Sequence, residues 1–157
     1  MKNLIKVLQI SIITLFVLTS CDSDDDTNSS NPTSTDAIAD VAETGTWRIT
    51  SFIDSGEDET SDFNGYNFTF NADGSLVATN GSNTLNGTWS VTNDSSSDDS
   101  SSSDDYDFNI FFPVPDDNDF EDLNDDWDID SVSSTEIALI DISGGNGDTD
   151  TLVFTRN

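Results

Sequence analysis

Alternating apolar and polar residues from Tyr66 to Asn71 constrain the fold of this chain more than any other feature. Tyr66, Phe68 and Phe70 alternate there with polar residues. Successive side chains of a β-strand point to opposite faces, so the pattern predicts a strand with one buried face. The next residues, Asn-Ala-Asp-Gly at 71–74, predict a hairpin turn. The residues from 66 onward therefore predict a hairpin of an antiparallel β-structure.

The same period of two predicts seven further strands. The first places Trp47, Ile49, Ser51 and Ile53 on one face, and the others are expected at 75–80, 85–91, 106–112, 127–132, 135–142 and 151–156. Eight short strands joined by turns predict an all-β fold, a small up-and-down antiparallel barrel, because closure leaves no exposed strand edge. A two-sheet β-sandwich is the alternative.

Two short helices and one loop are predicted between these strands. In the segment 37–43, apolar residues at i, i+3 and i+4 indicate a short helix covering one end of the domain. Phe120, Leu123 and Trp127 indicate a second helix over 117–126, with an apolar stripe facing the core. The segment 94–105 consists only of Ser and Asp and is expected to be a disordered loop.

The N-terminal residues 1–20 have the layout of a secretory signal. Lys2 and Lys6 precede an apolar run that is too short to cross a bilayer comfortably, although a retained membrane anchor is the alternative. The sequence Leu-Thr-Ser-Cys at 18–21 resembles the bacterial lipobox. That resemblance implies that Cys21 is acylated and becomes the new N-terminus, so that a covalent lipid holds the protein to a membrane.

Acidic residues directly follow the cysteine, namely Asp22, Ser23, Asp24, Asp25 and Asp26. They resemble the surface-export signal of lipoproteins in the Bacteroidetes, which implies an outer-membrane protein exposed on the cell surface. The alternative is that these residues only solvate a linker. We assign residues 21–43 to the lipidated cysteine and a flexible acidic tether, and residues 44–157 to the barrel domain.

Charge excludes several classes of partner. The formal net charge of −28 becomes −30 once Lys2 and Lys6 leave with the signal, and only Arg48 and Arg156 then remain as bases. So negative a surface repels nucleic acid and anionic lipid headgroups. With its one cysteine lipidated, the chain forms no internal disulfide and depends on its apolar core.

Gly45, Thr46 and Trp47 resemble the Gly-x-Trp motif of lipocalins, and the chain over 45–156 is similar to lipocalin-like lipoproteins of the Bacteroidetes. The resemblance implies a barrel floor formed by Trp47, with Arg156 packed across it. It also implies that inward side chains could line a site for a small apolar or glycan-like ligand. These candidates are Tyr66, Phe68, Trp89, Tyr106, Phe108 and Ile110.

Catalysis is not expected. The chain has no His, no Lys after cleavage and no free thiol, which excludes the common nucleophilic sites and Cys/His zinc sites. We expect no cofactor and no dedicated metal site, although weak calcium binding has candidates in Asp117, Asp119 and Glu121. The predicted function is a non-catalytic binding lipoprotein. The alternatives are an adhesion or structural module acting through an acidic, cation-binding surface and, less favoured, a hydrolase using paired carboxylates.

Overall fold

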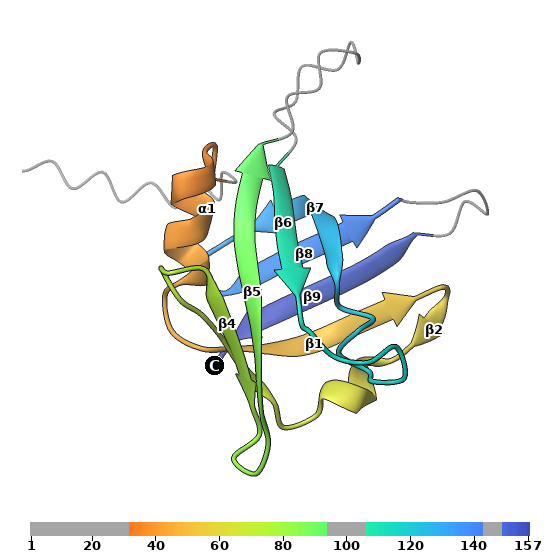
Figure 1. Cartoon of the computed structure of the whole chain (residues 1–157). Coiled ribbons are helices and arrows are strands. Elements are labelled where there is room, and N and C mark those ends of the chain that lie inside the picture. The colour runs from red at the N-terminus through yellow and green to blue at the C-terminus, as the bar shows by residue number, and fades with distance from the viewer. Residues whose placement is uncertain (1–31, 94–105, 143–148) are drawn as a thin grey trace, which may run out of the picture.

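The computed structural model describes residues 32–93, 106–142 and 149–157. Strands dominate these ranges, and each of the eight strands predicted from the sequence is present (Figure 1). In chain order the elements are α1 (Thr35–Ala42), β1 (Trp47–Asp54), β2 (Glu57–Asp58), the 3-10 helix η1 (Thr60–Phe63), β3 (Asn67–Phe70), β4 (Ser75–Thr79), β5 (Thr84–Asn93), β6 (Tyr106–Phe111), β7 (Asp125–Val132), β8 (Glu136–Asp141) and β9 (Asp150–Arg156).

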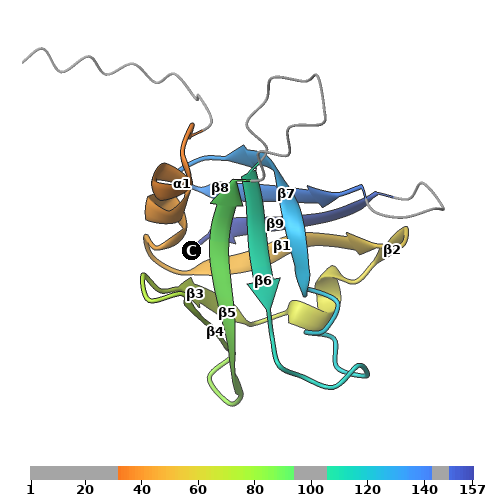
Figure 2. The same cartoon turned by 45° about the horizontal axis from the view of Figure 1, so that its top comes forward.

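The strands close into a barrel. Each strand from β3 to β8 pairs antiparallel with the next, and β1 pairs with β3 at Trp47↔Phe68. On its other side β1 pairs with β9, from Trp47↔Arg156 to Ile53↔Thr151 (Figure 2). The two-residue strand β2 pairs with the end of β1 as an addition to the barrel. The predicted barrel is confirmed. The sandwich alternative is wrong, because the β1–β9 pairing leaves one continuous sheet.

The first strand contains an irregularity that the sequence pattern hides. The register with β9 shifts between Ile49 and Ser51. Odd-numbered residues of β1 face inward before this shift, and even-numbered residues face inward after it. Phe52 is therefore fully buried, and Ile53, which was predicted to share the inward face, is only partly buried. A β-bulge adds one residue to one strand of a pair, which moves all later side chains to the other face.

Helix α1 confirms the helix predicted over 37–43 and belongs to the folded domain. The side chain of Ser34 caps it by accepting a hydrogen bond from the backbone N–H of Ala37 at 3.2 Å. Ile38 and Ala42 are fully buried, and the helix packs against β5. The domain boundary predicted at residue 44 is therefore too late, since the core begins with α1. Within the described ranges, no helix is long and apolar enough to cross a membrane.

The second predicted helix, over 117–126, is wrong. The segment between β6 and β7 instead forms consecutive turns, and β7 already begins at Asp125. Like charges one helical turn apart disfavour a helix here, and Asn and Asp side chains compete for the backbone. The i→i+3 hydrogen bonds of the turns run from Asn118 N to Pro115 O at 3.0 Å, from Glu121 N to Asn118 O at 2.8 Å and from Asn124 N to Glu121 O at 2.9 Å.

Each of the three tryptophans holds a connecting segment to the barrel through its indole N–H. Trp47 donates to the carbonyl of Ala42 at the end of α1 at 2.8 Å. Trp89 donates to the β3–β4 turn, and Trp127 donates to the turns before β7; the acceptors are Asn71 O at 3.0 Å and Leu123 O at 3.1 Å. A buried indole needs such a partner, so these bonds fix the segments that cover the core.

Candidate functional site

Several predicted site residues lie outside the described part of the chain. These are the lipidation residue Cys21 and the export residues Asp22, Ser23, Asp24, Asp25 and Asp26. The predicted loop at 94–105 lies outside it as well. The lipid address therefore stays a prediction from the sequence.

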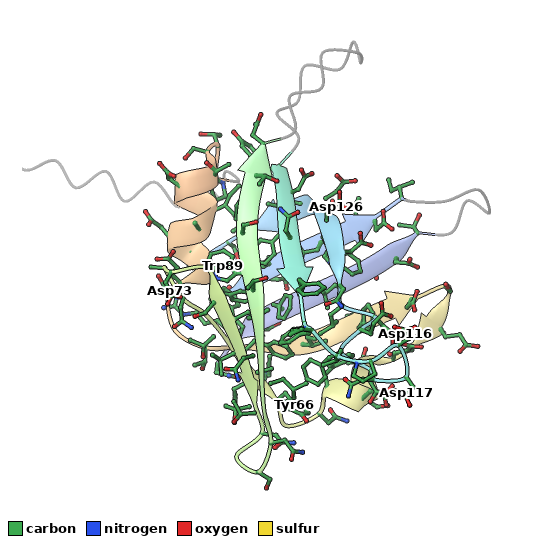
Figure 3. All side chains as sticks on the ribbon, in the orientation of Figure 1. Tyr66, Asp73, Trp89, Asp116, Asp117 and Asp126 are labelled. Atoms are coloured by element: carbon green, nitrogen blue, oxygen red, sulfur yellow. The ribbon has the colours of Figure 1, made fainter. Side chains whose placement is uncertain are left out.

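Four of the six predicted ligand-lining residues lie in the barrel core. Phe68 and Phe108 are fully buried, and Ile110 and Trp89 are 3% and 6% exposed. Rings pack closely across the interior: Trp89 stacks on Phe108 with centroids 5.5 Å apart, and Phe70 meets both rings edge-on at 5.2 and 5.3 Å. Figure 3 shows carbon-rich side chains filling the space that the strands enclose. These side chains therefore fill the part of the barrel interior that a barrel with an internal ligand site would leave empty.

The two predicted tyrosines lie at the margins of this core. Tyr66 is partly buried, and its ring meets Phe120 edge-on at 4.9 Å. Tyr106 is also partly buried, and its hydroxyl donates to the carbonyl of Thr33 at 2.7 Å, just before α1. Both rings therefore help to attach covering segments to the barrel.

Trp47 and Arg156 are direct register partners on β1 and β9. The Arg156 guanidinium lies over Gly45, since a Cβ built there would be 3.1 Å from Nε. Its Nη1 donates to the carbonyl of Ser134 at 2.9 Å, and its backbone N–H donates to Thr135. The arginine therefore joins the β7–β8 turn to the segment that enters β1.

The calcium candidates Asp117, Asp119 and Glu121 lie in the turns between β6 and β7, where Figure 3 labels Asp117. No group of three or more acidic side chains in the described ranges is arranged to hold a metal ion. Burial, followed by repulsion from neighbouring carboxylates, raises the pKa of both Glu59 and Asp122 on this side of the barrel. The carboxylates therefore repel one another here without forming a chelating cluster.

An open groove crosses the outer wall of the barrel over β5, β6 and β7. We call it the wall groove. Its volume is about 570 Å³, within the range of small-molecule sites. One large apolar side chain, Phe111, is 54% exposed there. The lining residues are Thr88, Trp89, Ser90, Asn109, Ile110, Phe111, Asn124, Asp125 and Asp126.

Strand register places the outward side chains of the wall groove in two rows. Thr88 faces Phe111 in one row, and Ser90 faces Asn109, which faces Asp126, in the other. The rows are about 7 Å apart along the strands, and neighbouring strands are about 4.8 Å apart. A flat aromatic ring therefore stands directly beside a row of polar groups.

The side chain of Asn124 fixes the end of β6 beneath the groove. Its Oδ1 accepts from the backbone N–H of Phe112 at 2.5 Å, and its Nδ2 donates to the carbonyl of the same residue at 3.0 Å. The amide thus replaces a strand partner where β7 has not yet begun. Because Phe112 is clamped and buried, its neighbour Phe111 points to the outer wall.

Asp125 is the one lining carboxylate that turns toward the core. It shares parity with buried Trp127, and its Oδ1 accepts from the backbone N–H of Asp126 at 2.8 Å. Burial raises the pKa of Asp125 to about 6, and the negative charges of Asp141 and Asp126 add to the shift. The inner side of the groove therefore titrates in mildly acidic solution.

Asp125→Asn is expected to stabilise the protein at neutral pH. Because folding raises this pKa, the carboxyl favours the folded state below its ordinary pKa of 3.8, and that stabilisation is lost as pH rises through about 6. Allowing for solvent screening of a half-buried group, we expect a gain of about 1 kcal/mol at pH 8 and almost none at pH 3. Urea unfolding at both pH values measures this, with Asp40→Asn, at an exposed position on α1, as the control for net charge. An equal gain at both pH values would contradict the assignment.

Sequence reasoning missed most of the wall groove, because it searched the inward faces for ligand-lining residues. Trp89 and Ile110 line the groove, but they were predicted as inward residues and their side chains are buried in the core. Phe111, Asn109 and Asp126 were not predicted. One signal was present: Ile110, Phe111 and Phe112 are consecutive apolar residues, which breaks the alternation of a strand with one wet face. Such a run requires an apolar side chain on the outer wall.

Comparison with known proteins gives one structural likeness. No protein-family model and no curated protein matches the chain. Among solved structures, the chain is similar to the crystal structure of a DUF4847 family protein from Bacteroides vulgatus. The two are 19% identical, the match covers 76% of this chain and 97% of that chain, and the TM-score is 0.47.

Proposed function

We propose that this chain is a lipid-anchored protein of the outer membrane, exposed on the cell surface, whose barrel is a non-catalytic binding module. The ligand binds on the outer wall of the barrel, in the wall groove. The observation that carries the proposal is the contrast between an interior packed with aromatic rings and an open groove with an exposed aromatic ring, Phe111.

Size and charge support a small ligand that is not an anion. A groove of about 570 Å³ matches a small-molecule site, whereas stable protein partners usually bury about 1,200–2,000 Å² of surface. Asp125 and Asp126 line the groove of a chain whose net charge is strongly negative. An anionic ligand would be repelled both on approach and at contact.

The proposed lipid anchor is tested by Cys21→Ala. Without the thiol no diacylglycerol is attached, so we expect an uncleaved precursor, no incorporation of labelled palmitate and loss of the protein from the outer-membrane fraction. Asp24→Asn combined with Asp25→Asn and Asp26→Asn is the matched control, since it keeps the lipid and removes only the proposed export charges. Unchanged lipid labelling of Cys21→Ala would refute the anchor.

The binding role is tested with the full-length lipoprotein in detergent, titrated with panels of soluble oligosaccharides and of fatty acids. We expect saturable binding to an oligosaccharide that shifts the amide NMR signals of Asn109, Phe111 and Asp126. Fatty-acid binding that shifts Phe68 and Phe108 would place the ligand inside the barrel. That result, or the absence of saturable binding to both panels, would overturn the wall groove as the ligand site.

A further inference from the structure

We propose that the wall groove binds a neutral sugar ring, with the face of the ring on Phe111 and its hydroxyls on Asn109 and Asp126. This inference rests on the proposed function and names its ligand class. A sugar ring has a face of C–H groups and an edge of hydroxyls. It therefore needs an apolar plane beside hydrogen-bonding groups, which is the arrangement that the two rows of the groove provide.

The apolar plane is the ring of Phe111. It is one of two large apolar side chains that are exposed in the described ranges, and the only one of the two that lines the groove. The clamp of Asn124 on Phe112 holds the adjacent backbone, so the strand end that carries the Phe111 ring is ordered before a ligand binds. Aromatic faces carry partial negative charge, which favours contact with the polarised C–H groups of a sugar.

The polar row is rich in acceptors. Nδ2 of Asn109 already donates to Oγ1 of Thr92 at 3.0 Å, which orients the amide and leaves its Oδ1 to accept from a ligand. The Asp126 carboxylate stands across from it and accepts only. Hydroxyls are suitable donors for both, and a hydroxyl bound to a carboxylate makes a charge-assisted hydrogen bond.

Charge decides between ligand classes with the same shape. A uronic acid would bring its carboxylate beside Asp125 and Asp126 and be repelled. The ammonium of an amino sugar would be attracted by these carboxylates. However, most of the lining groups, Thr88, Ser90, Asn109 and Asn124, are uncharged, and an ammonium gives up more hydration than a hydroxyl where it contacts them. The composition of the lining therefore favours a neutral sugar.

The test is calorimetry on the full-length lipoprotein with three matched probe sets: neutral gluco- and manno-oligosaccharides, oligogalacturonate and chitosan oligomers. We expect a neutral oligosaccharide to bind at least about tenfold more tightly than oligogalacturonate, at low salt. Asp126→Asn should weaken binding of the neutral oligosaccharide about threefold or more. It should also reduce the difference in affinity between the neutral oligosaccharide and oligogalacturonate. Phe111→Ala should weaken the neutral sugar about tenfold, because it removes the stacking plane.

Ile142→Ala is the matched control, because Ile142 is 65% exposed and lies outside the groove. This variant should bind the neutral oligosaccharide with the same affinity as the unchanged protein. Tightest binding to chitosan, lost in Phe111→Ala, would overturn the neutral sugar while leaving the wall groove as a binding site. Neutral-sugar binding that Phe111→Ala leaves intact would overturn the assignment to the groove. No binding of any probe would overturn both this inference and the binding role proposed above, whereas the lipid anchor is tested separately.

Discussion

Replacing Gly87 with alanine is expected to destabilise the barrel by about 3 kcal/mol or more. A Cβ at this position would stand 2.4 Å from the carbonyl oxygen of Phe111 and 2.9 Å from the ring of Phe112. The first atom belongs to the backbone, and Phe112 is buried, so neither can move away cheaply. Since small domains have about 5–15 kcal/mol of stability, the variant should lose much of it. Urea unfolding followed by circular dichroism measures the loss.

Gly81→Ala separates this clash from the general cost of replacing a glycine. Gly81 has a positive φ of 85°, and a Cβ there would meet nothing within 4 Å. Its replacement should cost only the strain of the left-handed backbone, about 1–2 kcal/mol. If Gly87→Ala cost no more than Gly81→Ala, the close approach of β6 to β5 would not be a constraint on the barrel.

Gly87 also connects the core to the wall groove. The absent side chain on β5 leaves room for the Phe112 ring, and Asn124 clamps the backbone of that same residue. The position of Phe111 on the outer wall therefore depends on a glycine that contacts no ligand. A strand glycine often marks such a close approach, yet the sequence does not say which segment approaches.

Strand positions could be predicted from the sequence because each strand of a barrel has one face exposed to solvent and one face buried in the core. The alternation around Phe68 and Phe70, and that around Phe108 and Ile110, survives in the structure as buried positions facing the core. The prediction failed at Ile53, where the bulge after Ile49 exchanges the two faces. A bulge depends on pairing with a distant strand, here β9, which a local pattern does not contain.

The turns before β7 show a second limit of sequence patterns. Phe120, Leu123 and Trp127 are all buried, as the predicted apolar stripe required, but no helix presents them. Phe120 is held by the rings of Phe63 and Phe112, at 5.3 and 5.0 Å. Tertiary packing of a few aromatic rings thus placed the same residues in the core without helical geometry.

The candidate site was harder to predict than the fold for a related reason. Asn109 and Asp126 are far apart in the sequence and become neighbours only through the register of β6 with β7. Among so many acids, Asp126 has no local feature that distinguishes it. The exposed ring of Phe111 was the one local signal, and its meaning depends on the polar row that register places beside it.

Trp47→Ala is expected to cost about 3–5 kcal/mol, because the side chain is fully buried and its loss leaves a large cavity. Trp47 also pairs with Phe68, the single register contact between β1 and β3, and donates to Ala42 at the end of α1.

Trp47→Phe isolates the hydrogen bond, since it keeps most of the ring and leaves a buried carbonyl without its donor, at a cost of about 1–3 kcal/mol. Trp89→Phe is its matched control, because its bond to Asn71 is only partly buried and should cost less. Urea unfolding gives the three values, and hydrogen exchange over 35–42 should accelerate in Trp47→Phe alone, since only that variant releases α1 from the barrel. Equal costs for the two Phe variants, with unchanged exchange in α1, would show that packing alone holds the helix in place.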